Sequence, residues 1–252
     1  MLTKRVIACL DVRDGAVVKG VSFTDLINAG DPAELARRYD RESIDEVIVL
    51  DITATLDGRG ALADTIRRVS AELFIPLTVG GGIRSVDDGK KMFEAGADKV
   101  SLNSAALERP ELISELAALY GSQAVVVAID AKQEEGRYAV FSRSATSDAR
   151  RDAVEWAREA ADRGAGEILL TSIDRDGTRA GFDCALTAAV STAVDIPVIA
   201  SGGAGTPDHF LEVFTAGRAD AALAASIFHF AEHSVMTLKK YLAAHGVPMR
   251  LC

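Results

Sequence analysis

Short apolar runs rich in Val, Ile, Leu and Ala recur along the chain, and segments with the apolar spacing of helices separate them. Each run is five to seven residues long, which suits a buried strand. Strands that alternate with crossover helices pair in parallel. The predicted strands are 5–11, 46–52, 77–81, 99–103, 124–130, 167–173, 198–203 and 221–226.

The predicted helices carry the usual signals at their ends. Asp31-Pro32 and Thr206-Pro207 each combine an N-cap residue with a proline in the first turn. Eight β/α units in 252 residues predict a (β/α)8 TIM barrel. A doubly wound sheet is the alternative, but no GxGxxG motif follows the first strand. The predicted helices are 31–43, 60–73, 85–96, 110–121, 150–164, 185–194 and 206–217.

The chain also repeats itself. The segment "IPLTVGGGIRSVDDGKKMFEAGADKVSLNSA" resembles "IPVIASGGAGTPDHFLEVFTAGRADAALAAS". Pro76 and Gly82 match Pro197 and Gly203, and both pairs are 121 residues apart. Such self-similarity indicates a duplicated unit, here four β/α pairs. We therefore predict a single barrel domain, 1–252, made of half-barrels at roughly 1–120 and 121–252.

An aspartate ends each of two strands that the repeat makes equivalent. Asp11 closes "CLD" and Asp130 closes "AID", 119 residues later, and an apolar run precedes each. Catalytic groups of (β/α)8 barrels lie at the C-terminal strand ends, although one polar residue there is more often a solvated strand end. Two opposed carboxylates are typical of an acid/base pair. Other polar residues at predicted strand ends are Asp51, Asn103, Thr171 and Ser201.

Glycine-rich segments follow the third and seventh predicted strands. They read "GGGIR" at 80–84 and "SGGAGT" at 201–206, and each leads into a predicted helix. Exposed backbone amides at a helix start bind anions. Tight turns alone would also explain these glycines, but two copies related by the repeat favour two phosphate sites on opposite sides. Lys19, in the glycine-flanked loop "RDGAVVKG", either closes over the substrate or is a solvated loop lysine.

Side-chain alternation predicts a charged cluster at the other end of the barrel. If Asp11 points inward, so does Arg5 on the same strand. The same rule brings Glu46, Lys99 and Glu167 to the level of Arg5. The cluster is either a structural ring of ion pairs or the floor of a passage. The second interpretation draws on the small residues predicted above it, Thr78, Ser101 and Ala128.

Composition and charge exclude several classes of protein. The net charge of −9 and pI near 5.0 disfavour a general nucleic-acid binder. No segment approaches the roughly 18 apolar residues of a membrane span, and the N-terminal run is too short for a signal peptide. Three scattered cysteines without CxxC spacing indicate a reducing, cytoplasmic setting. Without metal-ligand spacing, a GxSxG elbow or a GxxxxGK[ST] loop, we expect neither a metal nor a cofactor.

The ordered motifs resemble one known family. They are "ACLDV", "VLDITA", "TVGGGIR", "ADKVSLNSAA", "SQAVVVAIDAK", "GAGEILLTSIDRDGT", "ASGGAG" and "ADAALAASIFHF". From Met1 to Leu251 the chain is similar to the cyclase subunits of imidazole glycerol phosphate synthase, of histidine biosynthesis. The resemblance implies a (β/α)8 barrel that uses ammonia. Its substrate would be a bis-phosphorylated ribulosyl-formimino aminoimidazole carboxamide ribonucleotide. The products would be imidazole glycerol phosphate and aminoimidazole carboxamide ribonucleotide.

The resemblance also assigns roles to residues. Asp11 and Asp130 match the family's catalytic pair. Ammonia would come from a glutaminase subunit docked at the N-terminal face of the barrel, near Asp98 and Gln123. It would pass a gate that matches the four charged floor residues, Arg5, Glu46, Lys99 and Glu167. The implied substrate or phosphate contacts are Lys19, Gly82, Asn103, Ser104, Thr171, Asp176, Gly177, Ser201, Gly202, Gly203, Ala225 and Ser226.

Two alternatives stay open at the level of the sequence. The preceding isomerase of the same pathway shares the half-barrel repeat, the opposed aspartates and both phosphate sites. The motif "AIDAK" and the four-residue charged floor favour the ammonia user. A phosphate-binding barrel that only supports a partner would keep the glycine loops but would not need both aspartates.

Overall fold

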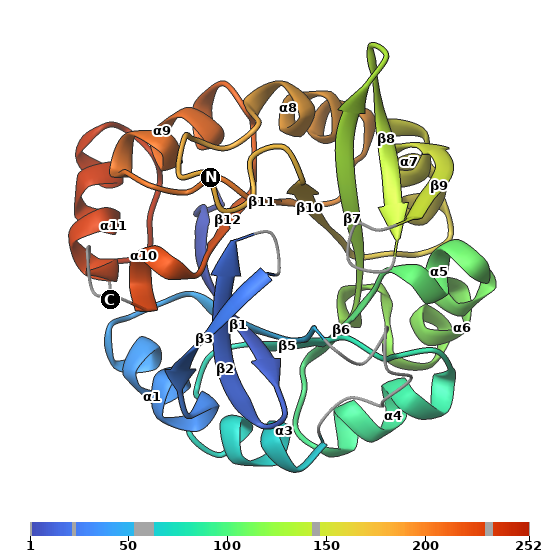
Figure 1. The fold of residues 1–252 in the computed structure, drawn as a ribbon, viewed down its shortest axis with the longest axis horizontal. Helices are drawn as coiled ribbons and strands as arrows, with labels where there is room; N and C mark the ends of the chain where they lie inside the picture. Colours follow the sequence, from blue (N-terminus) through green and yellow to red (C-terminus); the bar gives the residue numbers. More distant parts are fainter. Residues whose placement is uncertain (1, 22–23, 53–62, 143–146, 230–233, 252) are drawn as a thin grey trace.

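Eight parallel strands close into a barrel in the described part of the chain (Figure 1). The computed structural model describes residues 2–21, 24–52, 63–142, 147–229 and 234–251. The barrel order is β1, β4, β5, β6, β7, β10, β11, β12, and β12 pairs with β1 again. The predicted TIM barrel is therefore confirmed. Its strands are Arg5–Arg13 (β1), Glu46–Asp51 (β4), Leu77–Gly80 (β5), Lys99–Leu102 (β6), Val125–Glu134 (β7), Glu167–Ser172 (β10), Val198–Ser201 (β11) and Ala221–Ala224 (β12).

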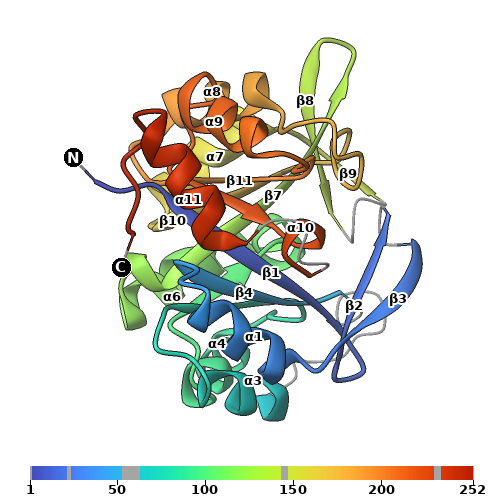
Figure 2. The same cartoon turned by 90° about the vertical axis from the view of Figure 1, so that its left-hand side faces the viewer.

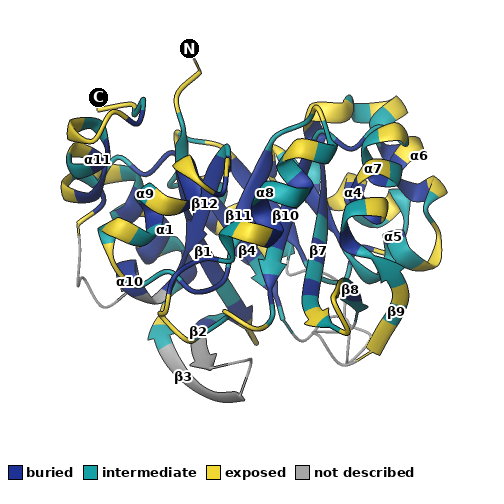
Figure 3. Ribbon diagram, turned by 90° about the horizontal axis from the view of Figure 1, so that it is seen from above, coloured by how far each residue is buried: buried dark blue, intermediate teal, exposed yellow. Residues whose placement is uncertain are grey.

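The helices form an outer layer around the strands (Figure 3). All seven predicted helices are present, although residues 60–62 of the second lie outside the described residues. The helices are Pro32–Arg41 (α1), Ala63–Ser70 (α3), Val86–Glu94 (α4), Ser104–Glu108 (α5), Glu111–Tyr120 (α6), Ala153–Asp162 (α7), Cys184–Ala193 (α8), Pro207–Thr215 (α9), Ser226–His229 (α10) and Val235–Ala244 (α11), with a 3-10 turn at Ser122–Ala124 (η1). Within the described ranges, no helix has both the length and the apolar character that a bilayer crossing requires.

Two antiparallel extensions rise from the barrel where loops were predicted. β1 continues into a hairpin with Ala16–Val21 (β2) and Thr24–Gly30 (β3), and β7 continues into Arg137–Ser142 (β8) and Ser147–Asp152 (β9). Both extensions lie at one end of the barrel, and both chain termini lie at the other (Figure 2). The loop prediction for Lys19 was wrong, because its backbone belongs to β2.

The predicted start of the helix at residue 150 was also wrong. Residues 150–152 belong to β9, and α7 begins at Ala153. Asp152 is the N-cap, and its side chain accepts hydrogen bonds from the amides of Val154 and Glu155. A carboxylate acceptor at this position satisfies amides that have no partner within the helix, so it fixes the boundary three residues later than the pattern suggested.

Alternating side chains divide the core into two layers. The inner layer fills the barrel with Ile7, Cys9, Ile48, Val126, Leu169, Ile199, Ala221, Leu223 and Ala225. The outer layer packs the opposite faces of the same strands against the helices. Because side chains alternate along a strand, this inner layer confirms that Cys9 and Ala128 face inward as predicted, with Ala128 packed at its edge.

An aspartate just before a strand recurs at the N-terminal end of the barrel. Asp45 precedes β4 and accepts a hydrogen bond from the amide of Val6, at 2.9 Å. Asp98 accepts from the amide of Leu77 at 2.8 Å, and Asp220 from that of Val198 at 3.2 Å. Each carboxylate thus ties the start of one strand to its neighbour. At the matching place before β10 stands Gly166, where a Cβ atom would lie 2.2 Å from the Ser122 carbonyl oxygen.

A buried ion pair anchors the last helix to this end. Lys239 of α11 is fully buried, and its Nζ lies 2.6 Å from Asp45 Oδ1 and 2.7 Å from the Ser43 carbonyl oxygen. Arg250 also reaches Asp45 Oδ1, at 3.2 Å. Burial lowers the pKa of Lys239, and the hydrogen bond to Asp45 opposes that shift. The pair joins the C-terminal segment to β4.

We expect Lys239→Met to lower the free energy of unfolding by about 2–4 kcal/mol, because it leaves the Asp45 carboxylate buried with a weaker set of partners. Lys240→Met is the matched control, since Lys240 is the exposed neighbour on the same helix. Urea unfolding of both variants measures the difference. Equal unfolding midpoints for the two variants would show that the pair does not stabilise the fold.

Candidate active site and charged floor

Asp11 and Asp130 lie on opposite strands of the barrel. β1 and β7 are four strands apart in either direction around the closed order of eight. Asp11 is in register with Leu50, and Asp130 is in register with Thr171. Neither aspartate ends its strand as predicted, because β1 runs on to Arg13 and β7 to Glu134. Both stand where barrel pairing gives way to the hairpin extensions, at the C-terminal mouth.

Asp130 is bound by an amide donor that follows β6 and by a hydroxyl donor on β10. Asn103 Nδ2 donates a hydrogen bond to Asp130 Oδ2 at 2.8 Å, and the Thr171 hydroxyl donates another. Burial nevertheless raises the pKa of Asp130 from 3.8 to about 6, and the negative charge of Asp176 adds to the rise, while the two hydrogen bonds oppose it. A carboxyl group with this pKa can give or take a proton near neutral pH.

Asp11 has a thiol below it in the barrel. Cys9 Sγ lies 3.2 Å from Asp11 Oδ1 and donates a hydrogen bond to it. Cys9 is 3% exposed and belongs to the inner layer of the core. The two carboxylates therefore have different surroundings. Unequal environments allow two chemically identical groups to take different roles in proton transfer.

The glycine loops are shaped by close backbone contacts. At Gly81, with φ of 92°, a Cβ atom would lie 2.2 Å from the Asp51 carbonyl oxygen. At Gly203, with φ of 98°, it would lie 2.1 Å from the Gly181 carbonyl oxygen. Both positions require glycine. The loop after β10 packs on the loop after β11, since the Gly181 amide donates to the Gly203 carbonyl at 2.8 Å.

The helices that follow the glycine loops are capped by their own side chains. Ser85 accepts a hydrogen bond from the Asp88 amide at the start of α4, and Thr206 forms a capping box with His209 at the start of α9. Each cap takes up one of the amides at its helix start, so the predicted phosphate sites also need the amides of the glycine loops. The short helix α5, which follows β6 and begins at Ser104, has no side-chain cap hydrogen bond.

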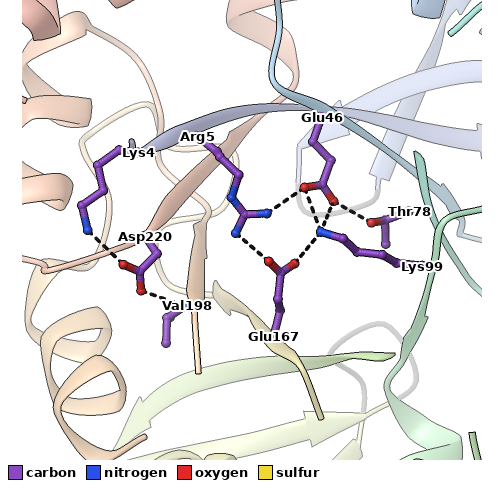
Figure 4. Close-up of polar contacts among 8 residues, drawn as sticks. All are labelled: Lys4, Arg5, Glu46, Thr78, Lys99, Glu167, Val198 and Asp220. Atoms are coloured by element: carbon purple, nitrogen blue, oxygen red, sulfur yellow. Dashed lines mark hydrogen bonds and ion pairs between the residues drawn. The ribbon is translucent and has the colours of Figure 1, made fainter. Parts of the chain in front are cut away.

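The four charged floor residues meet inside the barrel, as alternation predicted (Figure 4). Arg5 reaches Glu46 at 2.8 Å and Glu167 at 2.7 Å. Lys99 reaches the same two carboxylates at 3.1 and 2.9 Å. Charges of opposite sign therefore alternate around a closed ring. Thr78 adds a hydrogen bond of 2.7 Å to Glu46.

The ring is held together by charge in a largely buried environment, in which the Arg5 side chain is the most exposed at 25%. The side chain of Glu46 is 1% exposed, and those of Glu167 and Lys99 are 10% and 15% exposed. Burial alone would lower the pKa of Arg5, but attraction to Glu167 and Glu46 outweighs this and raises it. On β12, the residue level with Arg5 is Ala221, so a methyl group stands beside the ring on that side.

Comparison with known proteins decides the family. Residues 5–234 match the histidine biosynthesis protein family. The imidazole glycerol phosphate synthase subunit HisF of Acidobacterium capsulatum is 63% identical over 251 residues, which cover 100% of this chain and 99% of the relative. The protein of the same name from Bacillus licheniformis is 58% identical over 99% of this chain and all of the relative. The chain belongs to the HisF family.

Membership of the HisF family makes the chain a cyclase of histidine biosynthesis and does not favour the isomerase alternative. The geometry above therefore belongs to a member of the HisF family. Asn103, which the sequence placed on the wall of the site, contacts a carboxylate directly. Asn103 Oδ1 is buried without a hydrogen-bond partner among the described residues, so this amide keeps an acceptor available within the site.

The remaining predicted HisF residues fall into three groups. Ser201 ends β11 in register with Thr171, and the Asp176 amide donates to the Ser172 carbonyl at 2.9 Å in the loop beside it. Lys19 and Ser226 are described in their backbone alone. The others at this mouth are Gly82, Gly177 and Gly202, all with positive φ, and Ala225, which is buried in the inner layer.

Asp98 and Gln123 lie exposed at the opposite end of this HisF barrel, beside the floor. Asp98 caps the start of β5 through the Leu77 amide, and Gln123 Nε2 donates to the Tyr120 carbonyl at 3.2 Å. Sequence reasoning missed the strand-start aspartates and the contact between Cys9 and Asp11. The recurrence of Asp immediately before β4, β6 and β12 is the signal that would have identified the first.

Proposed function

We propose that the chain uses ammonia to convert the bis-phosphorylated ribulosyl-formimino aminoimidazole carboxamide ribonucleotide into imidazole glycerol phosphate and aminoimidazole carboxamide ribonucleotide. The observation that carries this proposal is the pair of carboxylates across the C-terminal mouth, with Asp130 at a pKa of about 6. Adding ammonia, cleaving the chain and closing a ring each require proton transfer. Asp11 and Asp130 perform these transfers as general acid and base.

A substrate with a phosphate at each end fits the symmetry of the mouth. The glycine loops follow β5 and β11, which face each other across the barrel. The line between these loops crosses the line between β1 and β7, where the aspartates stand. A bis-phosphate stretched between the loops therefore presents its middle to both carboxylates. Backbone amides at Gly82 and Gly203 bind the two phosphates, and the open acceptor of Asn103 binds a donor of the substrate.

Ammonia enters from a glutaminase subunit bound to the N-terminal face. Four large hydrophobic residues are exposed to solvent in the segments that adjoin the strand starts: Leu2, Phe74, Leu119 and Leu251. Exposed apolar residues mark a protein interface where they gather on one face. Asp98 and Gln123 supply polar contacts on the same face. The ring of four charges then gates a path that the small inward residues Ser101 and Ala128 leave open.

The decisive experiment uses the chain without a partner. With an ammonium salt, the purified protein is expected to consume the bis-phosphate and release both products, because bulk ammonia can reach the open mouth. Conversion of the aminoaldose isomer without consumption of the bis-phosphate would instead establish the isomerase. Tight substrate binding without either reaction would establish a scaffold.

A further inference from the structure

The two aspartates owe their equivalence to the repeat, but their hydrogen-bond donors are arranged differently. Thr171 is in register with Asp130, and the matching place beside Asp11 holds Leu50. Asn103 follows Leu102, which pairs with Val127, three residues before Asp130. The equivalent residue beside Asp11 is Ala225. It follows Ala224, which pairs with Ala8, three residues before Asp11. Thr171 and Asn103 donate hydrogen bonds to Asp130. The equivalent positions beside Asp11 are occupied by the apolar residues Leu50 and Ala225.

The opposite difference occurs two residues earlier on each strand, where a donor stands near Asp11 and an apolar residue near Asp130. Two residues before Asp130 stands Ala128, and two residues before Asp11 stands Cys9. Alternation points both side chains into the barrel beneath their aspartates, and both belong to the inner layer. The methyl group of Ala128 cannot donate a hydrogen bond, whereas the Cys9 thiol donates to Asp11 at 3.2 Å. Asp130 thus accepts hydrogen bonds from residues beside it, whereas Asp11 accepts one from Cys9, two residues earlier on its own strand.

We propose that Cys9 is a positioning residue for Asp11, an inference that rests on the proposed function. A thiol is a weak donor, but a bond to a carboxylate is stronger than one between neutral groups. Cys9 is held rigidly by a strand and by the packed inner layer, so its bond fixes one carboxylate oxygen of Asp11. Fixing the orientation of a reacting group raises the rate without a matching effect on binding.

Kinetics of three variants with ammonium as the nitrogen source test this role. Cys9→Ala removes the donor and is expected to lower kcat about tenfold while KM stays within about twofold. Cys9→Ser keeps a donor at the same place and is expected to stay within about threefold of the wild-type kcat. Ile199→Val is the control, because it trims a buried side chain of the same inner layer on β11, which pairs with neither β1 nor β7.

The outcomes separate this inference from the proposed function. An inactive wild type would contradict the proposed function, whatever the variants do. An active wild type with Cys9→Ala as active as Ile199→Val would overturn the positioning role, and so would Cys9→Ser as slow as Cys9→Ala.

A measurement without turnover tests the hydrogen bond itself in wild-type protein. The infrared S–H stretch of Cys9, isolated by subtracting the spectrum of Cys9→Ala, is expected to lie at the low frequency of a strongly hydrogen-bonded thiol. It should rise in Asp11→Asn, because a neutral amide oxygen is a weaker acceptor than a carboxylate. An unchanged frequency would show that the thiol does not donate to Asp11.

Discussion

Asp130→Asn is expected to lower kcat of the ammonium-driven reaction by about a thousandfold, while the affinity for the substrate changes little. Asparagine keeps the shape of the side chain and still accepts the hydrogen bond from Asn103. It cannot carry a proton in either direction. The measurement is single-turnover kinetics together with direct binding of the bis-phosphate.

Asp174→Asn is the matched control for this variant. Asp174 is an exposed carboxylate at the same end of the barrel, and its Oδ2 accepts a hydrogen bond from the Gln133 amide at 2.8 Å. Its replacement should leave kcat nearly unchanged. Substantial turnover by Asp130→Asn, or an equal loss in Asp174→Asn, would refute acid/base catalysis by the pair.

The pH dependence of wild-type kcat/KM should show a limb near pH 6, the pKa of Asp130. The groups around it allow the limb to be moved in two directions. Thr171→Val removes a hydrogen bond that lowers this pKa, so the limb should move to higher pH. Asp176→Asn removes a negative charge that raises it, so the limb should move to lower pH. Shifts in the same direction would assign the limb to another group.

The same carboxylate should weaken the fold. Its pKa rises from 3.8 in the unfolded chain to about 6 in the folded one, so the folded state binds more protons between these values. The free energy of unfolding therefore falls as the pH rises from about 4 to about 6. At pH 7 the free energy of unfolding of Asp130→Asn is expected to exceed that of the wild type by about 1–3 kcal/mol. Near pH 4 the two proteins should not differ. A residue that costs stability and is needed for turnover serves function rather than packing.

Features with a fixed period were predictable from the sequence. Strand side chains alternate with a period of two. Assuming that Asp11 and the strand-end residues Leu50, Asn103 and Thr171 point inward was therefore enough to bring Arg5 and its three partners together. The repeat then placed Asp130 opposite Asp11. Neither step needed a distance, because a closed barrel of eight strands fixes which positions face one another.

Features that depend on cross-strand register or on very short elements were not predictable. The contact between Asn103 and Asp130 depends on how β6 and β7 are aligned. Helices α5 and α10 have five and four residues, too few for a 3.6-residue period to emerge. The extensions β2 and β8 lie beside glycine turns that read as loops. The burial of Lys239 was not predictable either, because its partner Asp45 is 194 positions away in the sequence.

Lys99→Ala is expected to separate the two sources of ammonia. In the complex with its glutaminase, glutamine-driven kcat should fall about tenfold or more, whereas ammonium-driven kcat should stay within about threefold. On the proposed route, ammonia from the partner passes the ring, while ammonium salts reach the aspartates from the open mouth. Without Lys99, Arg5 is the one cation left between Glu46 and Glu167 in the ring, so the ring loses the alternation of charge that holds its geometry.

A structural role for the ring predicts a different pattern. If the ion pairs stabilise the barrel and nothing more, Lys99→Ala should lower the free energy of unfolding and reduce both activities equally. Lys91→Ala is the control, since Lys91 is exposed on α4 and pairs weakly with Asp88 at 4.0 Å. Urea unfolding measured beside both assays shows whether the variant is intact. A selective loss of glutamine-driven turnover in a folded protein is therefore the result that distinguishes a gate from a structural ring of ion pairs.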